Sequence, residues 1–122
     1  MFYPRPQGEK EMGKEMGKDH LQGALDLLVL KILQRGPAHG YALVQRIRQV
    51  SNDALRVHEG SLYPALHRME QADWIASEWR PTENGRRAKY YKLTAVGRRQ
   101  LAREREEWGR VAEGVAKVLR FA

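Results

Sequence analysis

The spacing of apolar residues between Glu59 and Ala72 constrains the fold most, because it fits an α-helix with one buried face. At about 100° per residue, one side of this helix collects Leu62, Ala65, Leu66, Met69 and Ala72. The opposite side carries Tyr63, Pro64 and His67, flanked by Ser61 and Arg68. Side chains of these types make the hydrogen bonds and apolar contacts that read base edges, so the outer face predicts a DNA contact.

A first helix is expected upstream, and it is apolar on more than one side. It begins near Asp19, which forms a capping box with Gln22, and it ends before Gly36-Pro37. One apolar stripe contains Leu21, Leu25, Leu28, Val29 and Ile32, and a second contains Leu27, Leu30 and Leu33. One small domain can hardly cover both stripes. We therefore expect Leu27 and Leu30 to meet a partner chain or the C-terminal helix.

A second helix over residues 40–50 completes a helix-turn-helix arrangement. Its expected buried side consists of Leu43, Ile47 and Val50. Ser61 is expected to cap the third helix, and Pro64 then falls in the first turn, where proline is tolerated.

From Ile75 the apolar period changes from helical to alternating, which predicts a β-hairpin. Asn84-Gly85 supplies residues that accept positive φ in the turn. Residues 80–92 hold five basic side chains and one acidic side chain, a net charge of +4. A hairpin of this charge after a helix-turn-helix is typical of the wing of a winged helix. Its candidate contacts to phosphate or the minor groove are Arg86, Arg87 and Lys89.

The last expected helix runs from residue 95 to about 121, with Thr94 as its N-cap. Its heptad positions hold Leu101, Trp108 and Val115 in one register and Glu104, Val111 and Val118 in the other. A second copy of the chain is the simplest cover for this largely apolar stripe. The predicted dimerisation residues are Leu27, Leu30, Leu101, Trp108, Val111, Val115 and Val118.

Length and charge limit the class of protein. The 122 residues suit one compact domain with a protruding element, and the net charge of +7 favours nucleic acid over acidic membrane surface as a partner. Cysteine is absent, which excludes disulfides, thiolate metal sites and cysteine nucleophiles and suits the cytosol. No apolar run resembles a signal peptide or a membrane span. We expect a cytoplasmic protein without a cofactor.

Catalysis and metal binding have little support in the sequence. The four histidines form no pair spaced by four residues, and no glycine-rich phosphate loop is present. The expected organisation is a flexible arm at residues 1–18, a winged helix-turn-helix domain at 19–94 and a dimerisation helix at 95–122. The predicted fold class is mainly α with a small β-hairpin, and we expect no enzyme activity and no metal site.

Two segments carry a family resemblance. Gly-Ser-Leu-Tyr-Pro-Ala-Leu at 60–66 and Arg-Arg-Ala-Lys-Tyr-Tyr-Lys-Leu-Thr at 86–94 resemble the PadR family of bacterial transcriptional regulators. Leu27-Leu-Val-Leu, His39-Gly-Tyr-Ala-Leu and Gly97 fit the same pattern. The resemblance covers roughly residues 20–120, and the length suits the subfamily that has a single C-terminal dimerising helix.

The resemblance implies a dimeric winged-helix repressor that leaves its operator when an effector arrives. A two-fold dimer in turn requires an inverted-repeat operator. Tyr41 resembles a family position near the DNA backbone. Trp108-Gly-Arg-Val resembles a segment of multidrug-sensing relatives in which the tryptophan stacks on flat aromatic ligands at the dimer centre. Asp73 stands where such proteins often have glycine, and aspartate tolerates the left-handed conformation better than most residues.

Several alternatives stay open from the sequence. Tyr41 can pack against the first helix, Ser61 can simply cap its helix, and Trp108 can be ordinary interface packing. For the whole chain, the alternatives are a winged-helix adaptor that binds protein without specific DNA binding, and an amphipathic helix that lies on a membrane. The wing's charge argues against the adaptor, and burial of the heptad face in a dimer argues against the membrane.

Overall fold

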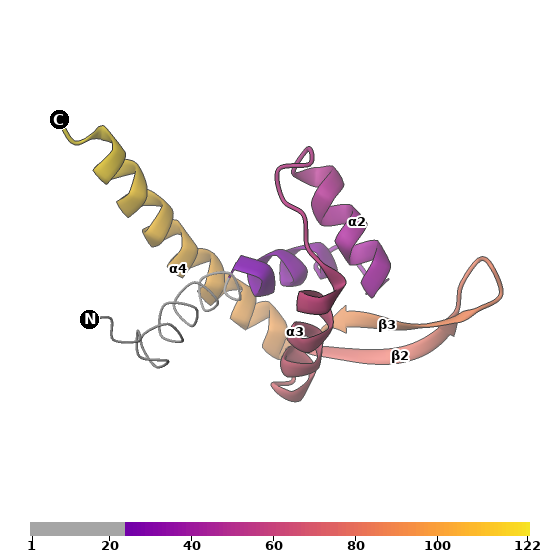
Figure 1. Cartoon of the computed structure of the whole chain (residues 1–122). Coiled ribbons are helices and arrows are strands. Elements are labelled where there is room, and N and C mark those ends of the chain that lie inside the picture. The colour runs from indigo at the N-terminus through magenta and orange to yellow at the C-terminus, as the bar shows by residue number, and fades with distance from the viewer. Residues whose placement is uncertain (1–23) are drawn as a thin grey trace, which may run out of the picture.

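The computed structural model describes residues 24–122. Residues 24–33 are helical, and the elements that follow are β1 (Ala38–His39), α2 (Gly40–Val50), α3 (Glu59–Gln71), β2 (Ile75–Pro81), β3 (Arg87–Leu93) and α4 (Ala95–Arg120). Figure 1 shows the hairpin of β2 and β3 and the helix α4 extending from the helical body in opposite directions. The predicted fold class is confirmed. The expected arm at 1–18 and the capping box of Asp19 and Gln22 lie outside the described residues.

The hairpin belongs to a three-stranded antiparallel sheet with the strand order β1-β3-β2. Ala38 pairs with Tyr91 in β3, and this short strand was absent from the sequence-based prediction. Two residues are too few to show an alternating pattern, so only pairing reveals β1. In the turn, Gly85 has a φ of 81°, whereas Asn84 is not among the residues with positive φ. The turn therefore needs one left-handed residue instead of the two predicted.

The core lies between the first helix, α2, α3 and the sheet, and Leu101 of α4 also belongs to it. Its fully buried side chains are Val29, Leu30, Leu43, Leu62, Leu66, Met69 and Ile75. The predicted inner face of α3 is confirmed except for Ala72, which is exposed beyond the last helical turn. Val50 is 67% exposed, so its predicted burial was wrong. It is the last residue of α2, past the turns that pack on the core.

Two predicted dimerisation residues belong to the chain's own core. Leu30 is 0% exposed and Leu101 is 3% exposed. Leu25, Val29 and Leu33 are buried beside Leu30, so the first helix does not divide into one core stripe and one partner stripe. Leu30 is therefore covered within the chain, in a core that also contains Leu101 of α4, and not by the partner chain that was the other expected cover. Leu27 is partly buried against the same core.

The start of α3 also differs from the prediction. The helix begins at Glu59 with His58 as N-cap, so Ser61 lies in the first turn and does not cap it. The Ser61 N–H donates to the His58 carbonyl over 3.0 Å. Pro64 consequently falls in the second turn, where it cannot donate to the carbonyl of Gly60. Gly60 is exposed, so that carbonyl can be hydrated.

Thr94 joins the start of α4 to the end of the helix-turn-helix. Its Oγ1 accepts from the Gly97 N–H at 2.9 Å, which confirms the predicted N-cap, and donates to the Asp73 carbonyl at 2.6 Å. Asp73 has a φ of 64°, in agreement with the left-handed conformation expected there. A Cβ added at Gly97 would overlap the carbonyl oxygen of Trp74. Only glycine lets α4 approach the sheet this closely.

We predict that Gly97→Ala destabilises the fold by about 2 kcal/mol, because the backbone of Trp74 must move to admit the methyl group. Gly109→Ala is the matched control on the same helix, since a Cβ there meets nothing within 4 Å. The control should raise the free energy of unfolding by about 1 kcal/mol, because alanine favours a helix more than glycine does. Urea unfolding followed by circular dichroism measures both changes, and equal effects of the two substitutions would contradict the close approach.

Candidate nucleic-acid interface

A groove of about 600 Å³ lies between the start of α2, the outer face of α3 and the hairpin. It is lined by Tyr41 and Tyr63 from the helices and by Trp79, Arg86, Arg87 and Lys89 from the hairpin, among others. Gly40 allows Tyr63 to approach the start of α2, because a Cβ on Gly40 would lie 2.7 Å from the Tyr63 hydroxyl oxygen. Five of the nine residues predicted to contact DNA thus line one concave surface.

The other four are on α3. Ser61, Pro64 and His67 are exposed, as predicted from the helical periodicity, but they do not line this groove. They face solvent beside Tyr63, which is 46% exposed. The solvent side of α3 and the groove together form a continuous candidate interface.

Arg68 is arranged differently from the prediction. Its two terminal nitrogens donate to the two carboxylate oxygens of Asp26, each over 2.8 Å. The Asp26 side chain is 6% exposed and that of Arg68 is 40% exposed, so the pair joins α3 to the first helix at the rim of the core. The hydrogen bond that Arg68 donates to Asp26 raises the pKa of the guanidinium above its usual value. We therefore revise Arg68 from a DNA contact to a residue that positions α3.

Glu70 anchors the other edge of the outer face of α3 to the hairpin. Its carboxylate accepts from the Ser77 hydroxyl at 2.5 Å and forms an ion pair with Lys89 at 3.3 Å. The hydrogen bond from Ser77, followed by the contact with Lys89, lowers the pKa of Glu70. Lys89, predicted as a DNA contact, is thus also part of the attachment between α3 and the hairpin.

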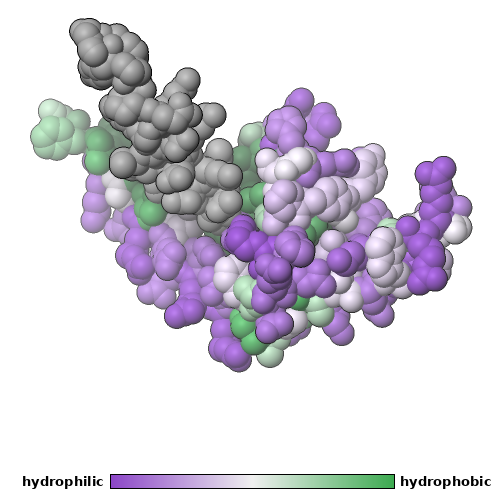
Figure 2. Space-filling model, turned by 60° about the horizontal axis from the view of Figure 1, so that its bottom comes forward, coloured by the Kyte–Doolittle hydropathy of each residue, from purple (hydrophilic) through white to green (hydrophobic). Residues whose placement is uncertain are grey.

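The hairpin carries fewer free cations than its net charge suggests. Arg80 is paired with Glu78, and Lys89 is paired with Glu70. Within residues 24–122, Arg86, Arg87 and Lys92 form no ion pair, and all three are exposed. Figure 2 shows the tip of the hairpin, at the right, covered by hydrophilic residues. Of these three cations, Arg86 and Arg87 lie next to the turn, whereas Lys92 lies opposite Ala76 at the other end of the hairpin.

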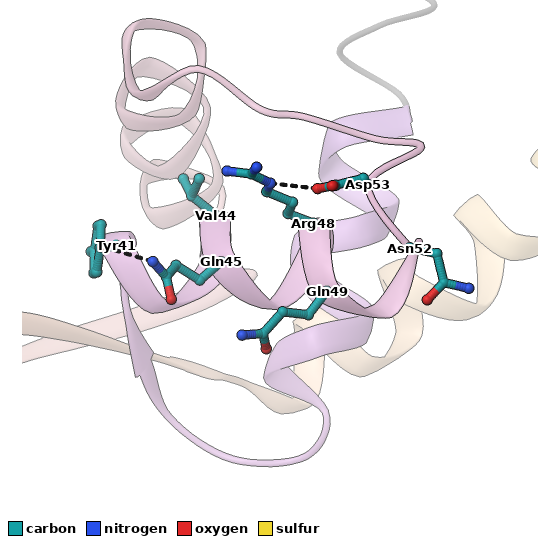
Figure 3. A pocket seen from close by; sticks show the side chains of 7 residues that line it. All are labelled: Tyr41, Val44, Gln45, Arg48, Gln49, Asn52 and Asp53. Carbon is teal, nitrogen blue, oxygen red and sulfur yellow. Dashed lines mark hydrogen bonds and ion pairs between the residues drawn. The ribbon is translucent and has the colours of Figure 1, made fainter.

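The outer face of α2 forms a shallow polar hollow, shown in Figure 3. Tyr41 accepts a hydrogen bond from Gln45 at 2.6 Å, and Arg48 binds Asp53 at 2.5 Å. Tyr41 is 57% exposed, so it is a surface residue of α2, with its ring also at the edge of the groove. The Arg48 contact lowers the pKa of Asp53.

Helix α4 exposes an apolar stripe beyond its second turn. Trp108 and Val111 are each 42% exposed, Val115 is 54% exposed and Val118 is 73% exposed. In Figure 2, hydrophobic atoms gather toward the end of this helix at the left. These four predicted dimerisation residues stay uncovered by residues 24–122, in contrast to Leu30 and Leu101.

Sequence reasoning missed three polar or aromatic residues of the site. Asp26 and Glu70 were overlooked because a single carboxylate on a helix usually faces solvent, and only their partners reveal their roles. Trp79 was treated as a strand residue without a function. A signal was present, since the two-residue period places Trp79 with Ile75 and Ser77 on the side of β2 that faces α3.

Residues 29–103, more than half of the chain, match the model of the transcriptional regulator PadR-like family. The chain belongs to the PadR family. It is 32% identical over 98 residues to a transcriptional regulator from Mycobacterium tuberculosis, which covers 80% of this chain and 88% of that protein. PadR-family proteins are DNA-binding regulators and not enzymes. The family therefore confirms the prediction of a DNA-binding transcriptional regulator and the prediction that the protein is not an enzyme.

Solved structures agree with this assignment. A PadR family transcriptional regulator from Eggerthella lenta has 31% sequence identity and a TM-score of 0.70, and the match covers 94% of this chain and 98% of the other. A transcriptional regulator from Clostridium thermocellum has 28% identity and a TM-score of 0.73, with 81% and 96% covered. Within residues 24–122, none of the helices of this PadR-family regulator has the length and apolar character needed to cross a membrane.

We predict that Asp26→Asn destabilises this PadR-family regulator by about 1–2 kcal/mol, because Arg68 loses its charged partner at the rim of the core. Asp53→Asn is the matched control, since it removes the same charge from an exposed pair with Arg48 and keeps a residue that tolerates positive φ. Chemical unfolding should show no measurable change for the control. Equal losses of unfolding free energy in both variants would show that the Asp26–Arg68 pair stabilises the fold no more than an exposed ion pair does.

The carboxyl group of Glu104 on α4 should make the stability of the fold depend on pH. Burial raises its pKa, and nearby Asp26 and Glu107 add to this, while a hydrogen bond from Gln100 at 3.0 Å and the charge of Arg68 oppose it. A raised pKa means that the folded state holds the proton more tightly than the unfolded state, so ionisation of Glu104 costs stability as pH rises.

Glu104→Gln should therefore unfold at higher urea concentration than wild type at neutral pH. The advantage should fade as pH falls through the raised pKa and disappear below the ordinary value of about 4.5. The exposed neighbour Glu106 provides the control Glu106→Gln. A stability difference for Glu104→Gln that does not change with pH would contradict this account.

Proposed function

We propose that this PadR-family regulator is a homodimeric repressor that binds an inverted-repeat operator and is released by a small planar aromatic effector. The observation that carries the DNA-binding part is the groove, where Arg86, Arg87 and Lys89 stand beside Tyr41 and Tyr63 with no carboxylate in the lining. A concave surface of this charge suits a nucleic-acid backbone.

In this proposal α3 lies in the major groove. Tyr63, Pro64 and His67 face the bases, and Ser61 lies near the backbone. Tyr41 approaches the phosphates from the start of α2. Arg86 and Arg87 reach phosphates or the minor groove beside it, and Lys89 shares its charge between Glu70 and the DNA.

The dimer is proposed from α4. Trp108, Val111, Val115 and Val118 recur at heptad spacing and are 42–73% exposed, so a second copy of the helix would remove them from water. Leu27, only partly buried, lies on the first helix and extends the stripe in the proposal. A two-fold dimer presents two copies of α3, which requires two half-sites in inverted orientation.

The effector proposal rests on Trp108 and on the family resemblance. A half-exposed indole at a dimer centre offers a flat apolar surface for an aromatic ligand. The adaptor alternative requires a partner other than DNA for a groove lined by three cations, and the charge of that lining argues against it.

The operator is tested by recovering the genomic fragments that the protein binds and by footprinting them. We expect two protected half-sites related by inversion, with centres roughly 34 Å apart or a multiple of that spacing. Protection of a single unrepeated half-site would contradict the dimeric mode of binding.

The same fragments separate the roles of the side chains. Arg86→Ala should weaken binding to every sequence and reduce the slope of log affinity against log salt by about 1. His67→Ala should weaken the specific site by roughly tenfold while random DNA is little affected. Equal losses on specific and random DNA for His67→Ala would remove it from base reading.

For the effector, we predict that planar aromatic compounds quench the fluorescence of Trp108 and release DNA. Trp108→Phe keeps an aromatic ring and should retain the dimer while weakening the release by several-fold. Sedimentation measures the dimer and DNA competition measures the release. If Trp108→Ala dimerises and responds as wild type does, Trp108 has no role in the effector response.

A further inference from the structure

Trp79 is exposed on the hairpin, and the fold does not account for it. It is 59% exposed, although burying an indole is one of the larger apolar gains available to a small domain. It lies on β2, whereas Trp108, Val111, Val115 and Val118 are on α4, which extends in the opposite direction (Figure 1). Trp79 is therefore separate from the stripe proposed for dimerisation.

The strand register shows which way the Trp79 side chain faces. Opposed residues of antiparallel strands share a face, and the pairs Ser77–Tyr91 and Trp79–Lys89 follow one another along the hairpin. Ser77 and Lys89 both bind Glu70 of α3. The face that contains Trp79 is thus the face turned toward α3, beyond the point where the core ends.

The opposite face of the sheet has a different arrangement. Arg80 lies over the Tyr90 ring at 5.4 Å, and His39 packs edge-on against the same ring at 5.1 Å. The aromatic ring on that face is thus occupied by neighbouring side chains. Trp79 remains as an open aromatic surface on the side of the hairpin that faces α3.

The groove beside Trp79 limits what can cover it. Its lining includes the cations Arg86, Arg87 and Lys89 and contains no aspartate or glutamate. Lys89 is paired with Glu70, but Arg86 and Arg87 form no ion pair within residues 24–122, so the groove favours an occupant that carries negative charge and also presents an apolar surface to the indole. The backbone of DNA meets both requirements, because phosphates alternate with deoxyribose rings whose faces are apolar.

We propose that Trp79 packs its indole against the deoxyribose of the DNA backbone flanking the site that α3 reads. This inference rests on the proposed function and adds a contact that is not ionic. Arg86 and Arg87 supply the charge next to it, and Trp79 supplies apolar burial that salt does not screen. The hairpin then holds DNA by two different forces.

The test compares Trp79→Ala, Trp79→Phe and Arg86→Ala on an operator fragment over a range of salt concentrations. Trp79→Ala should lose about tenfold in affinity at every salt concentration, with the salt slope unchanged. Trp79→Phe should recover most of that loss. Arg86→Ala should instead reduce the slope, which separates the ionic contribution from the apolar one.

Hydroxyl-radical footprinting supplies a second measurement, because it reports the exposure of deoxyribose. Wild type should protect the sugars beside each half-site, and Trp79→Ala should lose that protection while the central protection persists. Thermal unfolding of the free variants checks that the exposed position leaves the fold intact.

The outcomes distinguish the two proposals. Wild-type affinity and an unchanged flank footprint in Trp79→Ala would overturn the contact but leave the proposed function standing. Failure of wild type to bind any genomic fragment specifically would overturn the proposed function itself. Recovery of a protein partner through Trp79 with no effect on DNA binding would also overturn the contact.

Discussion

The bidentate pair between Asp26 and Arg68 determines how α3 is presented. Apolar packing of Leu62 and Met69 holds the helix against the core, but dispersion has little directional preference. Two parallel hydrogen bonds of 2.8 Å fix both distance and angle. With Glu70 bound to the hairpin along the other edge, rotation of α3 about its axis is opposed from both sides, and one face stays turned to solvent.

The same arrangement divides the basic residues into two groups. Arg68 and Lys89 are engaged with carboxylates and hold elements together, whereas Arg86 and Arg87 near the turn are exposed and without an ion pair among residues 24–122. Net charge alone does not distinguish these groups, because it counts a paired guanidinium and a free one equally. Arg86 and Arg87 can therefore attract a polyanion at the end of the hairpin without breaking an ion pair that holds the fold together.

The sequence predicted the parts that depend on local periodicity. The inner face of α3, the alternation of the hairpin and the cap at Thr94 follow from neighbours in the chain, and the structure agrees. Other features depend on distant residues. Arg68 pairs with a residue more than 40 positions away, and Leu30 and Leu101 are buried by residues of other elements, so no local pattern predicts these contacts. The actual contacts to DNA, partner and effector stay predictions, because they involve molecules outside this chain.

The burial of Leu101 has a mechanical consequence. Gly97 and Leu101 are buried, so the first two turns of α4 are packed against the part of the protein that includes α3. The rest of α4 extends from this point as a lever. From Leu101 to Arg120 this lever is roughly 28 Å long at about 1.5 Å per residue. A tilt of about 5° at its base displaces its far end by roughly 2.5 Å, and the reverse holds equally. A small change in packing near Trp108 would then change the angle between α4 and the core. No element would need to unfold.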